Sequence, residues 1–468
     1  MARGQPKALY LLFMTELWER FGFFTLVSIF AFYLTDRLNL PSDRAFLIFS
    51  TYISFAYLVT VGGGILADKA LGFGRAILLG AFLIACGYLV LGLADPSWVY
   101  WAMGLLAAGN GLFKANVAAL LGRFYQEDDP RRGPGFTLFY MGINIGVLAG
   151  ALFAGMIAQA YSYEAAFIVA GMGKLIAVAT YLAGRRLVSM HDGPPPGLKH
   201  PARAQGLAVV AVLLSAVVGA LLLRNQAWTA WILGIFGIVI VATYLVVILR
   251  QESDVRRRLF VHLALLFFAM IFWAVYQQYT LSVLLYAQQD VDRSLFGWVL
   301  PSSSTTALGA MALLLLWPLL TLLWPWLSKR GFHLGDLGKL ALSLVGLGLA
   351  YLLLAVVVEV TDEDGKASMI WIVGFYGFLG FGEILLAPLG LALTARLAPQ
   401  HLSGYAVGMW SFSFAAAVYL AGVLAVPQQI SGASAFGGWF LAYGITGLAT
   451  ALVLVAFLPR LSRALGHK

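Results

Sequence analysis

The sequence predicts an all-α polytopic membrane protein, and three observations support this fold class: its composition, its recurring hydrophobic runs and the placement of its charges. Of the 468 residues, 61% are hydrophobic and 11% are charged, and the mean hydropathy is +0.87. A soluble domain averages roughly 45–50% apolar and 25% charged residues. We therefore expect lipid, and not water, to surround most of this chain.

The hydrophobic runs divide the chain into about fourteen candidate transmembrane helices. Each is long enough for a bilayer, because roughly 20 apolar residues cross about 30 Å of hydrocarbon. The runs recur along nearly the whole chain, which favours one membrane body over several soluble domains. The candidate spans are 8–35, 44–67, 75–94, 98–123, 135–161, 163–186, 205–223, 227–249, 257–288, 304–327, 336–359, 368–396, 402–426 and 435–459.

The basic residues predict the orientation of these spans. The net charge of +9 could indicate a nucleic-acid partner. However, the charges lie in short loops, with about four Lys or Arg residues in predicted inner segments for each one in an outer loop. This bias predicts that both termini lie in the cytoplasm and that the charges do not bind nucleic acid. We expect a multi-pass protein of the bacterial inner (plasma) membrane.

A proline-rich polar stretch suggests how the helices are grouped. Residues 188–204 include the run HDGPPPGLKHPAR, which predicts a cytoplasmic linker. The two helices that follow, within 205–250, carry no intramembrane charge and are expected to be peripheral and to face lipid. Two six-helix bundles then remain, 1–187 and 251–468. This is the layout of the major facilitator superfamily, in which the substrate site lies between the halves.

Charges inside the spans are candidates for function, because an ionised side chain in hydrocarbon is costly. Glu16, Glu19 and Arg20 are spaced i, i+3, i+4 and share one face of the first helix. Two carboxylates and one guanidinium carry a net negative charge, and the like charges favour uptake of a proton by one carboxyl group. This arrangement predicts proton coupling, and the alternative is a structural ion-pair cluster.

Three further spans contain an isolated charge. Lys114 in the fourth span would add a second cation to Arg20, which suits a substrate carboxylate. Glu383 in a C-terminal span would suit a substrate ammonium, and a buried ion pair is the alternative for each. A zwitterion could then bridge the two halves. Lys174 in the sixth span has no evident acid, so we expect it to snorkel or to form a local pair.

The stretch GGGILADKALGFGR at the end of the second span predicts a gating element. Its glycines allow a tight turn, and Asp68 could pair with Arg75 or cap a neighbouring helix. It resembles the loop between helices 2 and 3 of the major facilitator superfamily. It carries no information on the substrate.

Several of these stretches together resemble the proton-dependent oligopeptide transporter family. The segment ELWERFGFF at 16–24 is similar to its helix-1 motif, and FYMGINIG at 139–146 is similar to its helix-5 motif. GNGLFKAN around Lys114 resembles the helix-4 lysine motif. FWAVYQQ at 272–278 and GEILLAPLG around Glu383 resemble helices 7 and 10, and Gly408-Met409-Trp410 resembles helix 11.

The resemblance implies uptake of di- and tripeptides, driven by the proton gradient through alternating access. It assigns the peptide carboxylate to Arg20 and Lys114 and the amine to Glu383. It assigns proton coupling to Glu16 and Glu19. The remaining implied substrate contacts are Asn144 and Tyr57 for the peptide backbone and Trp273 for a side-chain pocket.

Three departures from the family pattern concern the site. Phe23 and Phe24 replace a tyrosine pair, and Gln277 stands where helix 7 usually has an acid implicated in coupling. The stretch TTALGAMALLLLWP lacks the usual Asn-Pro. These changes could mean looser peptide recognition, altered coupling or another substrate.

Other function classes have less support. A major facilitator transporter of another small solute, such as a drug or nitrate, with weak or altered coupling remains the alternative. No metal-spaced cluster, phosphate loop or nucleophile–base pair indicates an enzyme, and we expect no metal and no cofactor. The expected partners are small peptides, protons and the lipid bilayer, and the expected state is a monomer.

Overall fold

The computed structural model describes residues 4–126, 129–190, 193, 200–295, 297–331, 334–361, 365–426 and 433–464. In these ranges, fourteen helices are long and apolar enough to cross a membrane, which confirms the predicted fold class. Residues 191, 192 and 194–199 of the predicted linker 188–204 lie outside the described residues, and its last four residues begin the helix Pro201–Arg224. The chain forms two compact units, and each is described by itself: residues 1–40 with 51–229, and residues 41–50 with 230–468.

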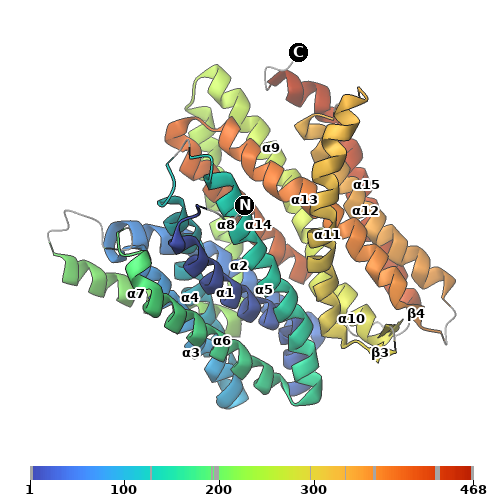
Figure 1. Cartoon of the computed structure of the whole chain (residues 1–468). Helices are drawn as coiled ribbons and strands as arrows, with labels where there is room; N and C mark the ends of the chain where they lie inside the picture. The colour runs from blue at the N-terminus through green and yellow to red at the C-terminus, as the bar shows by residue number, and fades with distance from the viewer. Residues whose placement is uncertain are drawn as a thin grey trace. The chain divides into compact units, whose positions relative to one another are not determined.

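The first unit contains the N-terminal helices and most of α2 (Figure 1). α2 begins in the second unit and continues into the first, because the division falls between Ser50 and Thr51. Short π-helical segments extend α1 and α2 at Tyr33–Arg37 and Ala67–Leu71. The helices are α1 Lys7–Phe32, α2 Ser42–Leu66, α3 Phe73–Leu93, α4 Val99–Gly122, α5 Arg132–Ala160, α6 Tyr163–Gly184 and α7 Pro201–Arg224.

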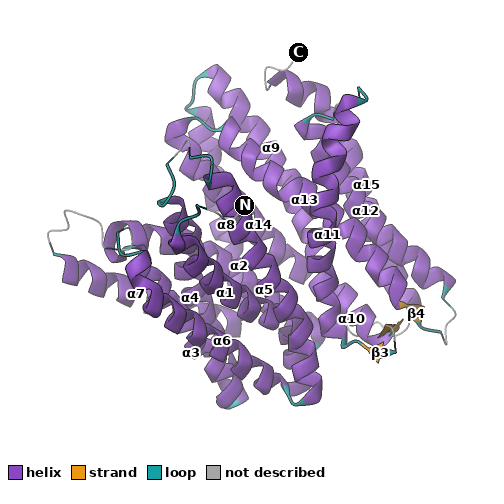
Figure 2. Cartoon of the chain, viewed as in Figure 1, coloured by secondary structure: helices purple, strands orange, loops and turns teal. Residues whose placement is uncertain are grey.

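The second unit contains the remaining helices and four two-residue strands (Figure 2). β1 pairs with β4 in parallel, and β2 pairs with β3 in antiparallel orientation. The helices are α8 Gln226–Leu249, α9 Ser253–Tyr276, α10 Ser282–Gln289, α11 Ala307–Lys329, α12 Asp336–Val360, α13 Met369–Leu397, α14 Ser403–Val423 and α15 Ala433–Ala464. The strands are β1 Val291–Asp292, β2 Ser294–Leu295, β3 Trp298–Val299 and β4 Ala367–Ser368.

Glycines allow the helix that carries the charged cluster to pack closely. α1 packs against α5 and α6. A Cβ atom on Gly146 of α5 would lie 2.3 Å from the carbonyl oxygen of Leu17, and one on Gly150 would lie 2.3 Å from that of Phe21. Only residues without a side chain therefore permit this approach between the backbones of α1 and α5.

One predicted span, 257–288, is not a continuous helix. α9 ends at Tyr276, a 3₁₀ turn covers Gln277–Thr280, and α10 starts at Ser282. The amide of Gln278 donates to the carbonyl of Ala421 at 2.8 Å, and the Ser282 hydroxyl donates to Gln278 Oε1 at 2.7 Å. These polar side chains hold the interrupted backbone where a continuous helix was predicted.

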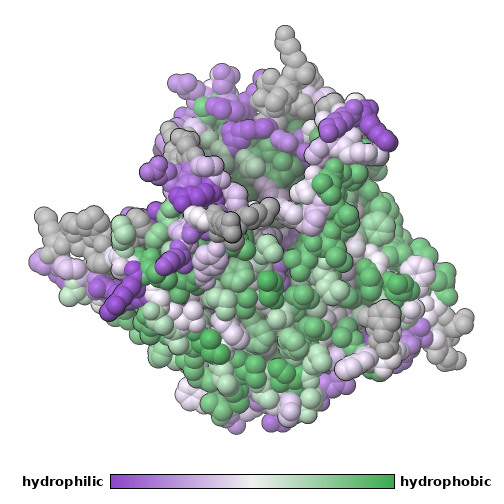
Figure 3. All heavy atoms as spheres, in the orientation of Figure 1, coloured by the Kyte–Doolittle hydropathy of each residue, from purple (hydrophilic) through white to green (hydrophobic). Residues whose placement is uncertain are grey.

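The outer faces of the helices are apolar, as expected of side chains that contact lipid. Figure 3 shows hydrophobic side chains over the flanks of the helices and hydrophilic ones near the helix ends. α8 is the extreme case, because most of its side chains are exposed, among them Trp228, Trp231 and Ile238. α7 instead packs against α4. The grouping of these two helices as a separate peripheral pair stays a prediction.

Candidate functional site

The three charged residues of α1 form a compact buried cluster. Glu16, Glu19 and Arg20 are 3%, 1% and 8% exposed. Arg20 Nε donates to Glu16 Oε1 at 2.8 Å and lies 3.0 Å from Glu19 Oε2. One guanidinium group thus serves two carboxylates, which a planar group with several donors can do. The helical spacing predicted this contact correctly.

Lys174 of α6 is a fourth member of the cluster. Its side chain is fully buried, so the snorkelling alternative is wrong and a pair is present. Its Nζ atom lies 3.7 Å from Glu19 Oε1 and 4.5 Å from the centre of the Phe113 ring. Two acids therefore face two bases, and Lys174 balances the net negative charge that was predicted for the three residues of α1. No local sequence pattern predicts this contact, because α6 is far from α1 along the chain.

Lys114 of α4 lies among aromatic rings. Its Nζ atom is 3.4 Å from the ring centre of Tyr57 and 5.3 Å from that of Phe23. The Cζ atom of Arg20 is 6.0 Å from the same Phe23 ring. Phe23 therefore lies next to both cations, and its π face can stabilise positive charge even though the tyrosine hydroxyl of the family motif is absent.

Asn144 is placed on α5, the helix that packs against α1. It is 5% exposed, and its Nδ2 atom donates to the carbonyl of Tyr140 at 2.9 Å. One donor of its amide is thus used within its own helix. Contact with a peptide backbone stays a prediction for both Asn144 and Tyr57.

Glu383 is held by a residue that the sequence analysis did not select. The Tyr276 hydroxyl donates a hydrogen bond to Glu383 Oε2, and joins α9 to α13 within the second unit. The Trp273 ring packs edge-on against Tyr276 at 5.2 Å and against Phe414 at 5.0 Å between ring centres. Tyr276 belongs to the FWAVYQQ motif, so a signal for it was present.

Gln277 is the first residue of the 3₁₀ turn that follows α9. It therefore comes directly after Tyr276, at the point where the helix is interrupted. A functional role for Gln277 stays a prediction.

Asp68 does not pair with Arg75, which was one of the two alternatives predicted for these gating residues. Asp68 lies in the π-helical segment after α2, and its Oδ1 atom is 3.9 Å from Arg123 of α4. Both side chains are more than half exposed, which makes this a weak ion pair. Arg123 also covers the Phe73 ring at 4.3 Å. Arg75 is exposed on α3.

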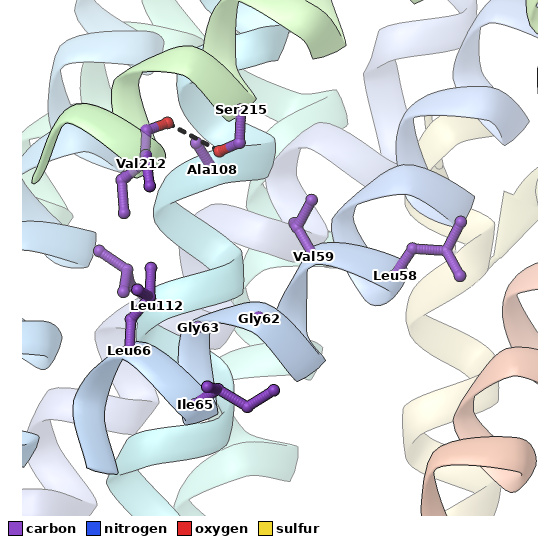
Figure 4. A pocket seen from close by; sticks show the side chains of 11 residues that line it. Leu58, Val59, Gly62, Gly63, Ile65, Leu66, Ala108, Leu112, Val212 and Ser215 are labelled. Atoms are coloured by element: carbon purple, nitrogen blue, oxygen red, sulfur yellow. Dashed lines mark hydrogen bonds between the residues drawn. The ribbon is translucent and has the colours of Figure 1, made fainter. Parts of the chain in front are cut away.

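A hollow of about 390 Å³ lies between α2, α4 and α7 but contains none of these residues (Figure 4). Its lining is apolar apart from Ser215, whose hydroxyl donates to the carbonyl of Val212 at 2.7 Å. A hollow with this lining offers no partner for a charged substrate. The candidate site is therefore the charged residues and not this hollow.

Known proteins resemble the chain over nearly its full length. It is 32% identical to a dipeptide and tripeptide permease A of Pectobacterium carotovorum, over 98% of this chain and 92% of the relative. It is also 32% identical to the dipeptide and tripeptide permease A of Escherichia coli, over 98% and 93%. A crystal structure of peptide transporter POT in complex with sulfate matches with a TM-score of 0.87 at 28% identity, over 99% of this chain and 96% of that one.

The family model covers the central and larger part of the chain. The POT family model matches residues 74–431. The match therefore includes the Lys114 region, Asn144, Lys174, Tyr276 and Glu383, while the helix-1 cluster is covered by the full-length relatives. With the fold and the arrangement of intramembrane charges, these matches show that the chain is a membrane transporter that belongs to the POT family.

Proposed function

We propose that the chain is a proton-coupled symporter that imports di- and tripeptides by alternating access. The observation that carries this proposal is the set of buried charges: a carboxylate–guanidinium cluster with a nearby lysine in the first unit, and a carboxylate in the second. A peptide is a zwitterion, so its two ends complement these charges. The relatives named as dipeptide and tripeptide permeases support the substrate class.

Lys114 and Arg20 bind the carboxylate of the peptide in this proposal. Arg20 is already engaged by Glu16 and Glu19, whereas Lys114 Nζ is buried over the Tyr57 ring and forms no ion pair with a carboxylate among the described residues. A buried cation without a counter-anion is costly, and an incoming carboxylate would relieve that cost. We infer that Lys114 makes the first contact and that Arg20 joins it once a carboxylate of α1 releases it.

Glu383 binds the amine of the peptide, and the aromatic residues beside it line the site. Tyr276 orients the Glu383 carboxylate, and Trp273 packs against Tyr276. Tyr57 and Asn144 contact the peptide backbone, and Gln277 lies at the helix interruption, where a side chain can reach the substrate. Asp68 and Arg75 act in gating near the end of α2.

Proton coupling acts through the α1 cluster. A proton bound by Glu16 or Glu19 removes the charge that holds Arg20, so the guanidinium becomes available to the substrate. The two protonation states then favour different conformations. One elementary charge that crosses 100 mV gains about 2.3 kcal/mol, so one or two protons can concentrate a peptide considerably.

The orientation proposed for the protein follows from its charge pattern. The spans cross the bacterial inner membrane, and both termini lie in the cytoplasm, because the basic residues concentrate in the predicted inner segments. The protein acts as a monomer.

Uptake of a labelled dipeptide into liposomes tests the function. An imposed inward proton gradient should drive accumulation, and preloaded unlabelled dipeptide should support counterflow without a gradient. Counterflow without gradient-driven accumulation would contradict the coupling and leave the substrate class standing. Loss of both would instead favour a transporter of another solute, for which the departures at Phe23, Phe24 and Gln277 supply the reason.

A further inference from the structure

Lys174 is a fully buried lysine that the proposed transport cycle does not use. We propose that Lys174 is the counter-cation of Glu19 and that their ion pair determines when Glu19 takes up the transported proton. The inference rests on the proposed function, since it concerns how the proton is coupled to transport. It assigns Arg20 mainly to Glu16 and Lys174 to Glu19.

The distances support this division of the cluster. Two nitrogen atoms of Arg20 approach Glu16 Oε1 at 2.7 and 2.8 Å, whereas Glu19 Oε2 is reached at 3.0 Å. The other Glu19 oxygen, Oε1, faces Lys174 Nζ at 3.7 Å. Each carboxylate therefore has a cation of its own, and Arg20 joins the two pairs.

Close packing of α6 on α1 places the lysine at this point. A Cβ atom on Gly22 would lie 3.7 Å from Lys174 Cε and 3.3 Å from the Tyr88 ring. A Cβ atom on Gly173 would lie 3.0 Å from the Trp18 ring. Gly173 thus allows α6 to approach the Trp18 ring of α1 closely, and the lysine stem lies in ordinary contact distance of Gly22. The ammonium group is fully buried where it faces Glu19.

Glu16 is also near Lys174, but only Glu19 lies within ion-pair distance of it among the described residues. The titratable and charged groups near the pair are Glu16 and Arg20 of α1, Lys114 of α4, Tyr52 of α2 and Tyr88 of α3. The Tyr88 hydroxyl donates a hydrogen bond to the carbonyl of Gly22 at 2.6 Å, and the Tyr52 hydroxyl accepts one from the Asn110 amide at 3.3 Å. Neither hydroxyl carries a charge that could replace Glu19 as the partner of Lys174.

In this geometry, protonation of Glu19 weakens the contact between α1 and α6. When a proton binds Glu19 Oε1, the carboxyl group becomes neutral and the ion pair with Lys174 Nζ is lost. The ammonium group is then buried opposite a neutral partner, which is unfavourable in hydrocarbon. The α1–α6 contact is thereby destabilised in the protonated state, so the other conformation is favoured. Such coupling requires no acid at position 277, where this chain has Gln277.

Protonation of Glu19 can be measured directly and apart from transport. Infrared spectroscopy of the purified full chain would follow the protonated carboxyl band across a pH titration, and Glu19→Gln identifies the band by its loss. An opposite charge within about 4–6 Å shifts such a midpoint by one to three pH units. Lys174→Met should therefore raise the midpoint by at least about one unit, and Lys174→Arg should restore it. An unchanged midpoint in Lys174→Met would overturn the proposal.

Transport separates this proposal from the proposed function. In liposomes, Lys174→Met should retain counterflow and lose most of the gradient-driven accumulation, while the control Lys329→Met, at an exposed position at the end of α11, should behave as wild type. Full driven uptake in Lys174→Met would also overturn the proposal. Absence of counterflow in the wild type would contradict the peptide function, and the infrared midpoint would still decide the role of Lys174. If Lys174→Met does not fold, the titration is made on Lys174→Arg and on the double variant Lys174→Met with Glu16→Gln. The larger cation of Lys174→Arg should lower the midpoint of Glu19 or leave it unchanged. A midpoint raised by the arginine would count against the pairing.

Discussion

At the scale of the residue, the α1 cluster shows what a local pattern can and cannot predict. Glu16, Glu19 and Arg20 lie on one helix, so their spacing alone predicts the contact between them. Lys174 comes from another helix, and its pairing depends on how α6 packs on α1. Because periodicity carries no information on such packing, the positive charge that Lys174 adds to the cluster could not be predicted from the spacing.

The role of Glu19 in coupling can be tested by one substitution. Glu19→Gln keeps the shape and removes both the negative charge and the proton site. Gradient-driven dipeptide uptake should fall to the level without a gradient, whereas counterflow should persist. Both are measured in liposomes with the same amount of protein. Driven uptake at the wild-type rate in this variant would show that the helix-1 carboxylate does not carry the coupling.

Glu383 can be tested with a pair of substrates that differ only in the amine. Glu383→Gln removes a charge-assisted hydrogen bond to a substrate ammonium, which is worth about 1.5–3 kcal/mol. The apparent affinity for a free dipeptide should fall by roughly tenfold to a hundredfold. The affinity for the N-acetylated dipeptide, which has no ammonium group, should change little. An equal loss for both substrates in competition assays would argue against the amine assignment.

At the scale of the element, the spans could be predicted but their interruption could not. Hydrophobic length is a local property, and the predicted spans match the fourteen observed helices closely. The interruption after Tyr276 depends on two hydrogen bonds with residues near the end of α14, which are distant in sequence: Gln278 donates to the carbonyl of Ala421, and the Ser282 hydroxyl accepts from the backbone N–H of Val426. The contacts of α8 could not be predicted either, because they also join residues that are distant in sequence. The Tyr244 hydroxyl lies 2.6 Å from His262 Nδ1 of α9, and His262 Nε2 lies 3.2 Å from Thr394 Oγ1 of α13.

Two neighbouring glycines in α2 provide a matched test of helix packing. A Cβ atom on Gly63 would lie 2.0 Å from the carbonyl oxygen of Gly111 in α4, whereas one on Gly62 would meet nothing within 4 Å. Gly63→Ala should therefore destabilise the protein by about 1–3 kcal/mol through overpacking. Gly62→Ala should be neutral or slightly stabilising. Thermal unfolding in detergent compares the two, and an equal effect would contradict the close α2–α4 contact.

At the scale of the whole molecule, the distribution of charge is what predicts orientation. The basic residues are concentrated in alternate loops, so a count over short loops determines which side faces the cytoplasm. The helices themselves carry no such information, because an apolar segment spans the bilayer equally well in either direction. Orientation in the membrane is therefore a property of the loops, and it requires a measurement in intact cells.

The single cysteine of the chain makes this measurement straightforward. Cys86→Ala gives a cysteine-free background, since position 86 holds the only cysteine. Lys69→Cys lies in a predicted inner loop and Arg224→Cys at a predicted outer one, and both positions are exposed. A membrane-impermeant thiol reagent added to spheroplasts should label Arg224→Cys and leave Lys69→Cys unlabelled until the membrane is permeabilised. If Lys69→Cys were labelled first and Arg224→Cys only after permeabilisation, the orientation predicted by the positive-inside bias would be wrong.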